Sequence, residues 1–222
     1  FHAPDPDTSL TETIEGYSIF NEDQWEAHKI EGFNNISGAV QFRGQLFLSS
    51  HGQGVYDYAG AKLFTDTELK KASITDMWST DDFLWFTNYM SQVPLGSFDG
   101  EGLSFLSSAQ LGTTTPLSLE GSSGDILWIK NSLSERYGVI AFDPSKNLIW
   151  GAGSSSNIPS IAVHDIEVNR DDELWMATKL GPAYFSDASV ISKEAQAYVP
   201  YFENEILFED ENITALAFDG GD

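Results

Sequence analysis

The amino-acid sequence predicts an all-β protein: a β-propeller of four-stranded antiparallel blades, with about four full blades and one split, incomplete blade. Three observations predict this fold class. A leucine–aromatic pair recurs along the chain, a short alternating segment stands in front of each pair, and another hydrophobic strand follows it. These features identify repeated supersecondary units, although a β-sandwich with evenly spaced strands is an alternative.

The leucine–aromatic pair sets the period of the repeat. Successive copies stand roughly 40 to 50 residues apart, which is the usual length of one propeller blade. In most copies a turn containing Asp or Gly comes just before the pair, and these residues tolerate the positive φ angles of tight hairpins. The blade-forming pairs are Leu46-Phe47, Leu84-Trp85, Leu127-Trp128 and Leu174-Trp175. We expect the rings of the three tryptophans to pack between blades.

The segments around each pair supply the other strands. Alternation with a period of two predicts half-buried first strands at 36–40, 74–78, 163–168 and 213–218. Third strands are expected at 54–58, 102–106, 138–143 and 181–185, and weaker fourth strands follow, for example at 147–150. Single helical turns are expected at 67–72 and 192–195.

This pattern predicts one propeller domain, or a fragment of one, over residues 1–222. The blades are expected at 36–64, 74–106, 115–150 and 161–202. Residues 14–28 would supply strands of a split blade, and 213–222 would supply the first strand of the closing blade. Because the turn at 219–222 has no strand to lead into, we expect the chain to be a piece of a larger propeller protein.

Charge is the unusual feature of the composition. With 34 acidic and 11 basic residues, the net charge is −23. Such a charge repels phosphate backbones, so nucleic acid is not an expected partner, and adhesion to anionic lipid is disfavoured too. No apolar run is long enough to span a bilayer, so we expect no direct membrane insertion.

The sequence predicts no catalytic residues, no metal, no cofactor and no enzyme activity. Its four histidines lack the spacing of a zinc site, and Gly121-Ser122-Ser123-Gly124 lacks the spacing of a nucleophile elbow. Acidic turns such as Asp99-Gly100-Glu101 offer oxygen ligands but do not match a calcium loop, so we interpret them as solvated hairpin turns. A propeller lyase or glycosidase would need convergent carboxylates in the central channel, which spacing alone does not reveal.

Binding groups are expected in the loops between second and third strands, at 88–97, 131–137 and 178–181. Aromatic and cationic side chains gather there on an otherwise acidic chain, and such residues are enriched where partners dock. The candidate binding residues are Tyr89, Arg136, Tyr137 and Lys179.

The repeat resembles that of the two-component-regulator propeller family. The best copy runs from Ile166 through the acidic turn and Leu174-Trp175 to Thr178, with Gly181 opening the next strand. The first copy departs from the pattern, with Phe47 where Trp is expected. The stretches 199–204 and 211–221 are similar to PorZ-type propellers of the type IX secretion system of Bacteroidetes.

The resemblance implies a non-catalytic binding or scaffold propeller at the bacterial cell surface or in the periplasm. Its expected partners are envelope proteins, a surface glycan or lipopolysaccharide. The alternative role within the same resemblance is the periplasmic ligand-sensing domain of a hybrid two-component histidine kinase.

Overall fold

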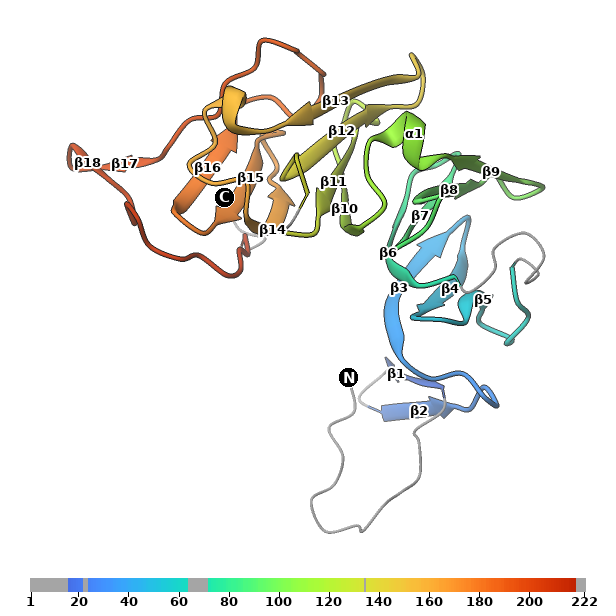
Figure 1. Cartoon of the computed structure of the whole chain (residues 1–222). Coiled ribbons are helices and arrows are strands. Elements are labelled where there is room, and N and C mark those ends of the chain that lie inside the picture. Colours follow the sequence, from blue (N-terminus) through green and yellow to red (C-terminus); the bar gives the residue numbers. More distant parts are fainter. Residues whose placement is uncertain (1–15, 22–23, 64–71, 134, 219–222) are drawn as a thin grey trace.

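The computed structural model describes residues 16–21, 24–63, 72–133 and 135–218, and it is almost entirely β. Four antiparallel sheets follow one another as blades and form an open arc, with the first strand of each blade along the concave side (Figure 1). The described residues form one short helix, α1 (Ser108–Leu111), and one 3-10 turn, η1 (Ser154–Ser156). The prediction of an all-β propeller is confirmed.

Blades 2 and 3 each have four strands paired in sequence order. In each blade the first strand, which we call the inner strand, is joined to the second strand by a tight turn, as the repeated turn residues predict. Blade 2 contains β6 (Ile74–Ser79), β7 (Leu84–Asn88), β8 (Leu95–Phe98) and β9 (Leu103–Leu106). Blade 3 contains β10 (Pro116–Gly121), β11 (Leu127–Asn131), β12 (Val139–Asp143) and β13 (Leu148–Ala152).

Within the described residues, blades 1 and 4 have three strands each, in place of the four strands expected in every blade. The fourth strand is reduced to one bridge, Tyr56 with Lys62 in blade 1 and Tyr184 with Tyr198 in blade 4. In blade 4 the intervening chain is drawn towards blade 3, where the Ala197 N–H donates to the Ser156 carbonyl at 2.8 Å. The strands are β3 (Ile36–Phe42), β4 (Gln45–Ser50) and β5 (Gly54–Asp57), then β14 (Val163–Val168), β15 (Leu174–Thr178) and β16 (Gly181–Phe185).

Two short hairpins flank the blades. The N-terminal hairpin pairs β1 (Tyr17–Asn21) with β2 (Gln24–His28), and the second pairs β17 (Tyr201–Phe202) with β18 (Glu205–Ile206). Residues 211–218 run beside blade 4 without forming a regular strand: the Ile213 N–H donates to the Thr178 carbonyl at 3.0 Å. The expected strand residues 14–15 and 219–222 lie outside the described part of the chain.

The third strand of blade 2 differs from the prediction. It is β8 (Leu95–Phe98), and the segment expected there, 102–106, instead contains the fourth strand, β9. Pro94 and Gly96 make this stretch look like a loop in the sequence. Gly96 is needed in the strand because the Phe86 ring lies over it, and a Cβ at this position would stand 2.3 Å from that ring. The loop expected at 88–97 is therefore shorter, Tyr89 to Pro94.

The expected helical turns are not helices in the described residues. Residues 192–195 form a turn closed by a bond from the Ala195 N–H to the Ser192 carbonyl, 3.1 Å long. Most of 67–72 lies outside the described part of the chain. The helix α1 begins where the Ser107 side chain and Gln110 form a capping box, and it ends at Gly112 in the left-handed conformation.

Aromatic pairs join neighbouring blades, as predicted for Trp85 and Trp128, whereas the half-buried Trp175 stacks on Tyr184 of its own blade with ring centroids 4.6 Å apart. In each inter-blade pair, the aromatic residue of a second strand meets the phenylalanine on the third strand of the next blade. The second-strand members of these pairs are nearly buried, so each pair contributes both apolar burial and ring contact. Ring centroids lie 6.3 Å apart for Phe47 and Phe98, 5.8 Å for Trp85 and Phe142, and 5.9 Å for Trp128 and Phe185.

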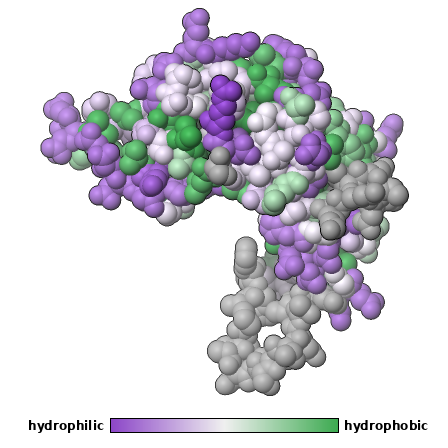
Figure 2. Space-filling view, viewed as in Figure 1, coloured by the Kyte–Doolittle hydropathy of each residue, from purple (hydrophilic) through white to green (hydrophobic). Residues whose placement is uncertain are grey.

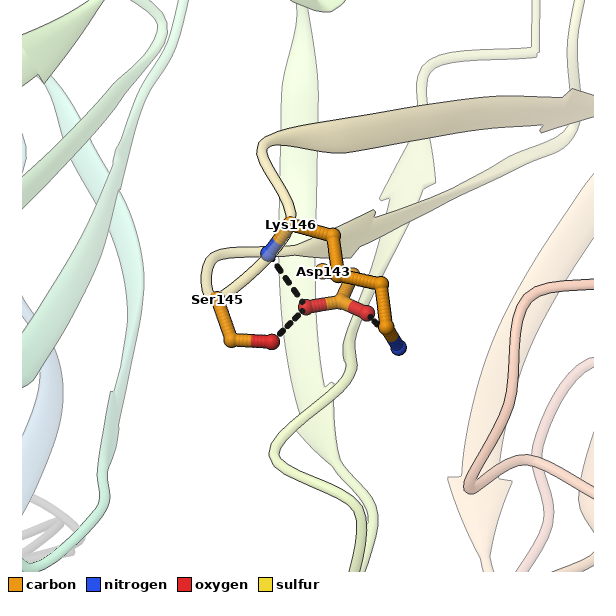
Figure 3. A network of polar contacts seen from close by, with 3 residues as sticks. All are labelled: Asp143, Ser145 and Lys146. Atoms are coloured by element: carbon orange, nitrogen blue, oxygen red, sulfur yellow. Dashed lines mark hydrogen bonds and ion pairs between the residues drawn. The ribbon is translucent and has the colours of Figure 1, made fainter.

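The turn of blade 3 between β12 and β13 is organised by a buried carboxylate (Figure 3). Asp143 is 2% exposed; it accepts hydrogen bonds from the Ser145 hydroxyl at 2.6 Å and the Lys146 ammonium at 2.7 Å. Burial alone would raise the pKa of Asp143, but the hydrogen bonds from Lys146 and Ser145 outweigh it and lower the pKa to about 2. This carboxylate has a structural role.

Polar side chains cover most of the face seen in Figure 2, with apolar patches over blade 4. Helices in the described residues are too short to serve as membrane-crossing segments.

Candidate functional site

The loops between second and third strands lie at one end of the blades, together with the starts of the inner strands. In all four blades, the N–H just after the second strand donates to the carbonyl just before the inner strand. These bonds join His51 to Asn35, Tyr89 to Ser73, Ser132 to Thr115 and Lys179 to Ala162, with lengths of 2.8 to 3.1 Å. We call this surface the loop face, and the opposite surface, formed by the hairpin turns, the turn face.

The four predicted binding residues occupy three blades of the loop face. Tyr89 is half-buried after β7, and Lys179 is exposed after β15. Arg136 and Tyr137 lie together before β12, with the guanidinium carbon 5.2 Å from the centre of the Tyr137 ring. The Tyr137 ring also packs on Gly151, where a Cβ would stand 2.6 Å from the ring. Tyr137 therefore supports blade 3, and Arg136 is the more accessible of the two.

The structure adds an apolar row that the sequence interpretation missed. Met90, Leu133 and Leu180 each stand two residues beyond the end of a second strand, and their exposed fractions are 76%, 50% and 42%. The corresponding residue in blade 1 is Gly52. An exposed apolar side chain at the equivalent position of three successive blades is an arrangement that isolated surface residues do not have. Aligning the repeats at their second strands would have revealed it.

The backbone at Met90 is held in a tight loop. Its φ of 53° lies in the left-handed region, which is unfavourable for a residue with a side chain. Ten other described non-glycine residues share this conformation, among them Asp125 and Asp172 in hairpin turns, so the conformation marks a tight turn. Here the neighbouring Ser91 hydroxyl accepts a hydrogen bond from the Asn88 amide at 2.8 Å, which fixes the loop.

Over blades 2 and 3 the loop face carries little charge on a strongly acidic protein: the segments 89–94, 107–115, 132–138 and 153–162 contain Glu135 and Arg136 as their only charged residues. Blade 4 differs, because the exposed acidic segment 209–211 lies beside its loop with Lys179, where the Gly181 N–H donates to the Glu211 carbonyl at 2.8 Å. Glu135 accepts a hydrogen bond from the Thr115 hydroxyl at 2.6 Å and so anchors its loop. The turn face, in contrast, carries Asp81, Asp82, Asp99, Glu101, Asp125, Asp171 and Asp172. A weakly charged surface with apolar anchors suits a protein partner better than the acidic turn face does.

A second polar feature lies along the concave side, on the inner strands. The Asp76 carboxylate accepts hydrogen bonds from the Met77 N–H at 2.8 Å and from the Leu119 N–H of the next blade at 2.9 Å. Asp165 repeats this arrangement with the Ile166 N–H at 3.1 Å and the Leu216 N–H at 2.9 Å. Each aspartate therefore fastens one inner strand to the segment that follows it.

Both aspartates occur where the inner strand is irregular. Every inner strand shifts register against its second strand at the same point, between Ile74 and Met77 in blade 2 and between Val163 and Asp165 in blade 4. Such a bulge frees a backbone N–H from the ladder. The aspartate carboxylate accepts a hydrogen bond from that N–H, so it replaces the ladder bond that the bulge removes.

Glu120 lies among these carboxylates. Burial, followed by the nearby charges of Asp76, Glu167 and Asp165, raises its pKa to about 8. Burial also raises the pKa of Asp76 and lowers that of Lys130, although Asp165 and Asp76 partly oppose the change at the lysine. A pKa of about 8 keeps the Glu120 carboxyl group mostly protonated at neutral pH, which is the protonation state that a general acid needs.

The sequence interpretation did not find this group of acids. Asp76 and Asp165 are engaged with backbone N–H groups, which leaves Glu120 and Glu167 as the groups available for chemistry. In the part of the chain that the structure describes, no three His, Cys, Asp or Glu side chains converge in a way suited to a metal ion.

By sequence, the chain matches no protein-family model and no curated protein. By structure, it is similar to PorZ, an essential bacterial surface component of the type IX secretion system of Porphyromonas gingivalis. The TM-score is 0.69 and the identity 14%, over 91% of this chain and 34% of PorZ. This chain therefore spans about a third of the length of PorZ.

Two further solved structures are similar to this chain, and they belong to proteins of other classes. The extracellular domain of a putative hybrid two-component system from B. thetaiotaomicron matches with a TM-score of 0.58 and 14% identity, over 78% of this chain and 25% of that chain. Virginiamycin B lyase from Staphylococcus aureus matches with a TM-score of 0.61 and 13% identity, over 86% of this chain and 65% of that chain. The structural neighbours thus include both protein classes named by the repeat resemblance, and at these identities the shared property is the fold.

Proposed function

We propose that this chain is a non-catalytic binding or scaffold propeller of a bacterial envelope or cell-surface protein, and that it binds its partner through the loop face. The observation that carries this proposal is the row of exposed apolar side chains, Met90, Leu133 and Leu180, on a surface that carries little charge over blades 2 and 3. Exposed apolar anchors next to aromatic and cationic groups are typical of the centre of a protein interface.

The similarity to PorZ and to a sensor domain supports the proposed location, the periplasm or the cell surface. The proposed partner is an envelope protein, with a surface glycan or lipopolysaccharide as the alternative ligand. Arg136 and Lys179 supply cations for its carboxylate or phosphate groups. A ligand-sensing domain of a hybrid two-component kinase would use the same face.

The test compares apolar anchors on the two faces. A triple variant, Met90→Ser, Leu133→Ser and Leu180→Ser, is compared with Tyr58→Ser, which removes an exposed aromatic ring from a turn after β5. Immobilised protein is exposed to a Bacteroidetes envelope extract and, separately, to purified lipopolysaccharide. We expect the triple variant to lose at least about tenfold of its capture of a defined envelope protein, since each anchor contributes on the order of 1 kcal/mol. Equal capture by both variants would place binding elsewhere.

The acids on the concave side favour one second candidate, a propeller lyase or glycosidase. Glu120, with its pKa of about 8, has the protonation state of a general acid at neutral pH. A substrate screen should then find turnover that Glu120→Gln abolishes while circular dichroism stays unchanged. Turnover that survives this substitution would exclude Glu120 as the acid.

A further inference from the structure

Blade 4 carries a preformed pocket at its outer edge, and none of the apolar anchors of the loop face lines it. In blades 2 and 3 a short turn leads from the third strand to the fourth. In blade 4 the twelve residues 186–197 take the place of that turn and arch over the end of blade 3. The pocket beneath this arch, which we call the rim pocket, has a volume of about 310 Å³. This lies at the lower end of the range for small-ligand sites.

The arch is held at both ends. The Trp128 indole N–H donates to the Ala188 carbonyl at 2.9 Å, and the Ala197 N–H donates to the Ser156 carbonyl at 2.8 Å. Ala188 and Ala197 are 0% and 2% exposed, so both ends are buried. Just before Ala188, the Asp187 carboxylate accepts hydrogen bonds from the Ser189 N–H and hydroxyl at 2.9 and 2.6 Å. A loop fixed in this way holds a pocket open at little entropic cost to binding.

Aromatic rings form the floor and one wall of the rim pocket. Trp128 and Phe185 are stacked at 5.9 Å and nearly buried, and Trp150 stands edge-on to Phe185 at 5.6 Å. Trp150 is only half-buried. Tyr198 is 55% exposed and also lines the pocket, so two rings remain accessible to a ligand.

The polar part of the lining is acidic. Asp187 and Glu194 are the charged residues of the lining, and Glu194 is exposed. The neighbouring Lys193 is exposed but does not line the pocket. Aromatic faces and carboxylates both attract cations, and they do so on a chain whose net charge is −23.

We propose that the rim pocket binds an organic ammonium group, either a quaternary ammonium ion or the primary ammonium of a lysine side chain. Trp150 and Tyr198 supply the ring surfaces, and Glu194 supplies the countercharge. This site is separate from the loop face, so either proposal can fail without the other.

The experiment follows the tryptophan indole N–H signals of the whole chain by two-dimensional NMR. Choline and N-acetyl-lysine amide are the two cationic probes. The neutral isostere 3,3-dimethylbutan-1-ol controls for shape, and methyl glucoside controls for ring stacking with a sugar. We expect the signals of Trp128 and Trp150 to shift with choline or the lysine amide and not with the neutral compounds. The cation that binds with the lower dissociation constant shows whether the pocket prefers a quaternary ammonium ion or the ammonium group of a lysine side chain.

Two variants locate the countercharge. Glu194→Gln should weaken the binding of the cation by about two- to fivefold, since a single carboxylate or ring contributes modestly at a partly exposed site. Glu205→Gln, an exposed glutamate in β18, is the matched control and should leave binding unchanged. Tyr198→Ala should weaken binding by a similar factor. Shifts of equal size with the neutral isostere, stronger binding of methyl glucoside, or no shift with either cation at millimolar concentrations would overturn the proposal.

Discussion

Replacing Glu120 with glutamine should stabilise the protein at alkaline pH and leave it unchanged near pH 4. The folded protein raises the pKa of Glu120 from 4.5 to about 8, first through burial and then through the charges of Asp76, Glu167 and Asp165. The folded state therefore holds a proton that the unfolded chain releases. The stability associated with this group is fully present below pH 4.5 and is lost as the pH rises towards 8.

The magnitude follows from the same pKa values. A carboxyl group whose pKa rises from 4.5 to about 8 loses at most about 5 kcal/mol of folding free energy when it ionises. Glu120 is only half-buried, and solvent screening reduces this value. We expect Glu120→Gln to be more stable than the parent by about 1–2 kcal/mol at pH 9, or by about 2–8 °C in Tm for a domain of this size.

Thermal unfolding followed by circular dichroism between pH 4 and 9 measures the effect. Glu101→Gln is the matched control, because Glu101 is exposed in a turn and its removal changes the net charge equally. The Tm difference between Glu120→Gln and the parent should grow with pH, whereas the Tm difference between Glu101→Gln and the parent should stay constant with pH. If Glu120→Gln is less stable than the parent at pH 9, the protonated buried carboxyl described above is wrong.

Three further substitutions test the packing. Phe142→Ala should destabilise the protein by about 3–5 kcal/mol in urea unfolding, because Phe142 is 4% exposed and packs between blades. The control Phe20→Ala should change stability by less than about 0.5 kcal/mol, because Phe20 is 57% exposed. Equal effects would contradict the inter-blade pairing. Gly96→Ala should cost about 1–3 kcal/mol because its Cβ meets the Phe86 ring, and a stability equal to that of Gly102→Ala, which faces open space, would refute this contact. Asp143→Ala should lower the free energy of unfolding by about 1.5–3 kcal/mol above pH 5. Because the pKa of Asp143 is lowered to about 2, this stability difference between variant and parent should shrink as the pH falls through 4 towards 2. A difference that stays constant with pH would argue against an ionised carboxylate.

The fold could be predicted from the sequence because a propeller repeats local signals. Alternation, a turn and a leucine–aromatic pair recur with one period, and the inter-blade packing of Trp85 and Trp128 follows from their common position in the repeat. The third strand of blade 2 was missed for a local reason: Pro94 and Gly96 are typical of loops, and the need for Gly96 arises only from the Phe86 ring above it. In blade 4 the fourth strand is reduced to a bridge for a reason that is likewise not local, because the chain after β16 bonds to Ser156 of the neighbouring blade.

The candidate site could be predicted only in part. Cations and rings in the loops, such as Arg136 and Lys179, stand out in an acidic sequence. Met90 and Leu133 do not, since an isolated apolar residue in a sequence gives no sign of being exposed. The acids of the concave side depend on contacts between distant segments, such as the bond between Asp76 and the Leu119 N–H, 43 residues away. No spacing rule within one repeat reveals such a contact.

The repeat also explains why Glu120 is the acid that holds a proton. At the bulge of the inner strand, blades 2 and 4 have Asp76 and Asp165, whereas blade 3 has Ser118. Each aspartate accepts two backbone N–H groups, and an ionised carboxylate accepts them best. Glu120 lies between these two charges on the strand that has no aspartate of its own, so protonation at Glu120 relieves the repulsion without loosening either inner-strand contact.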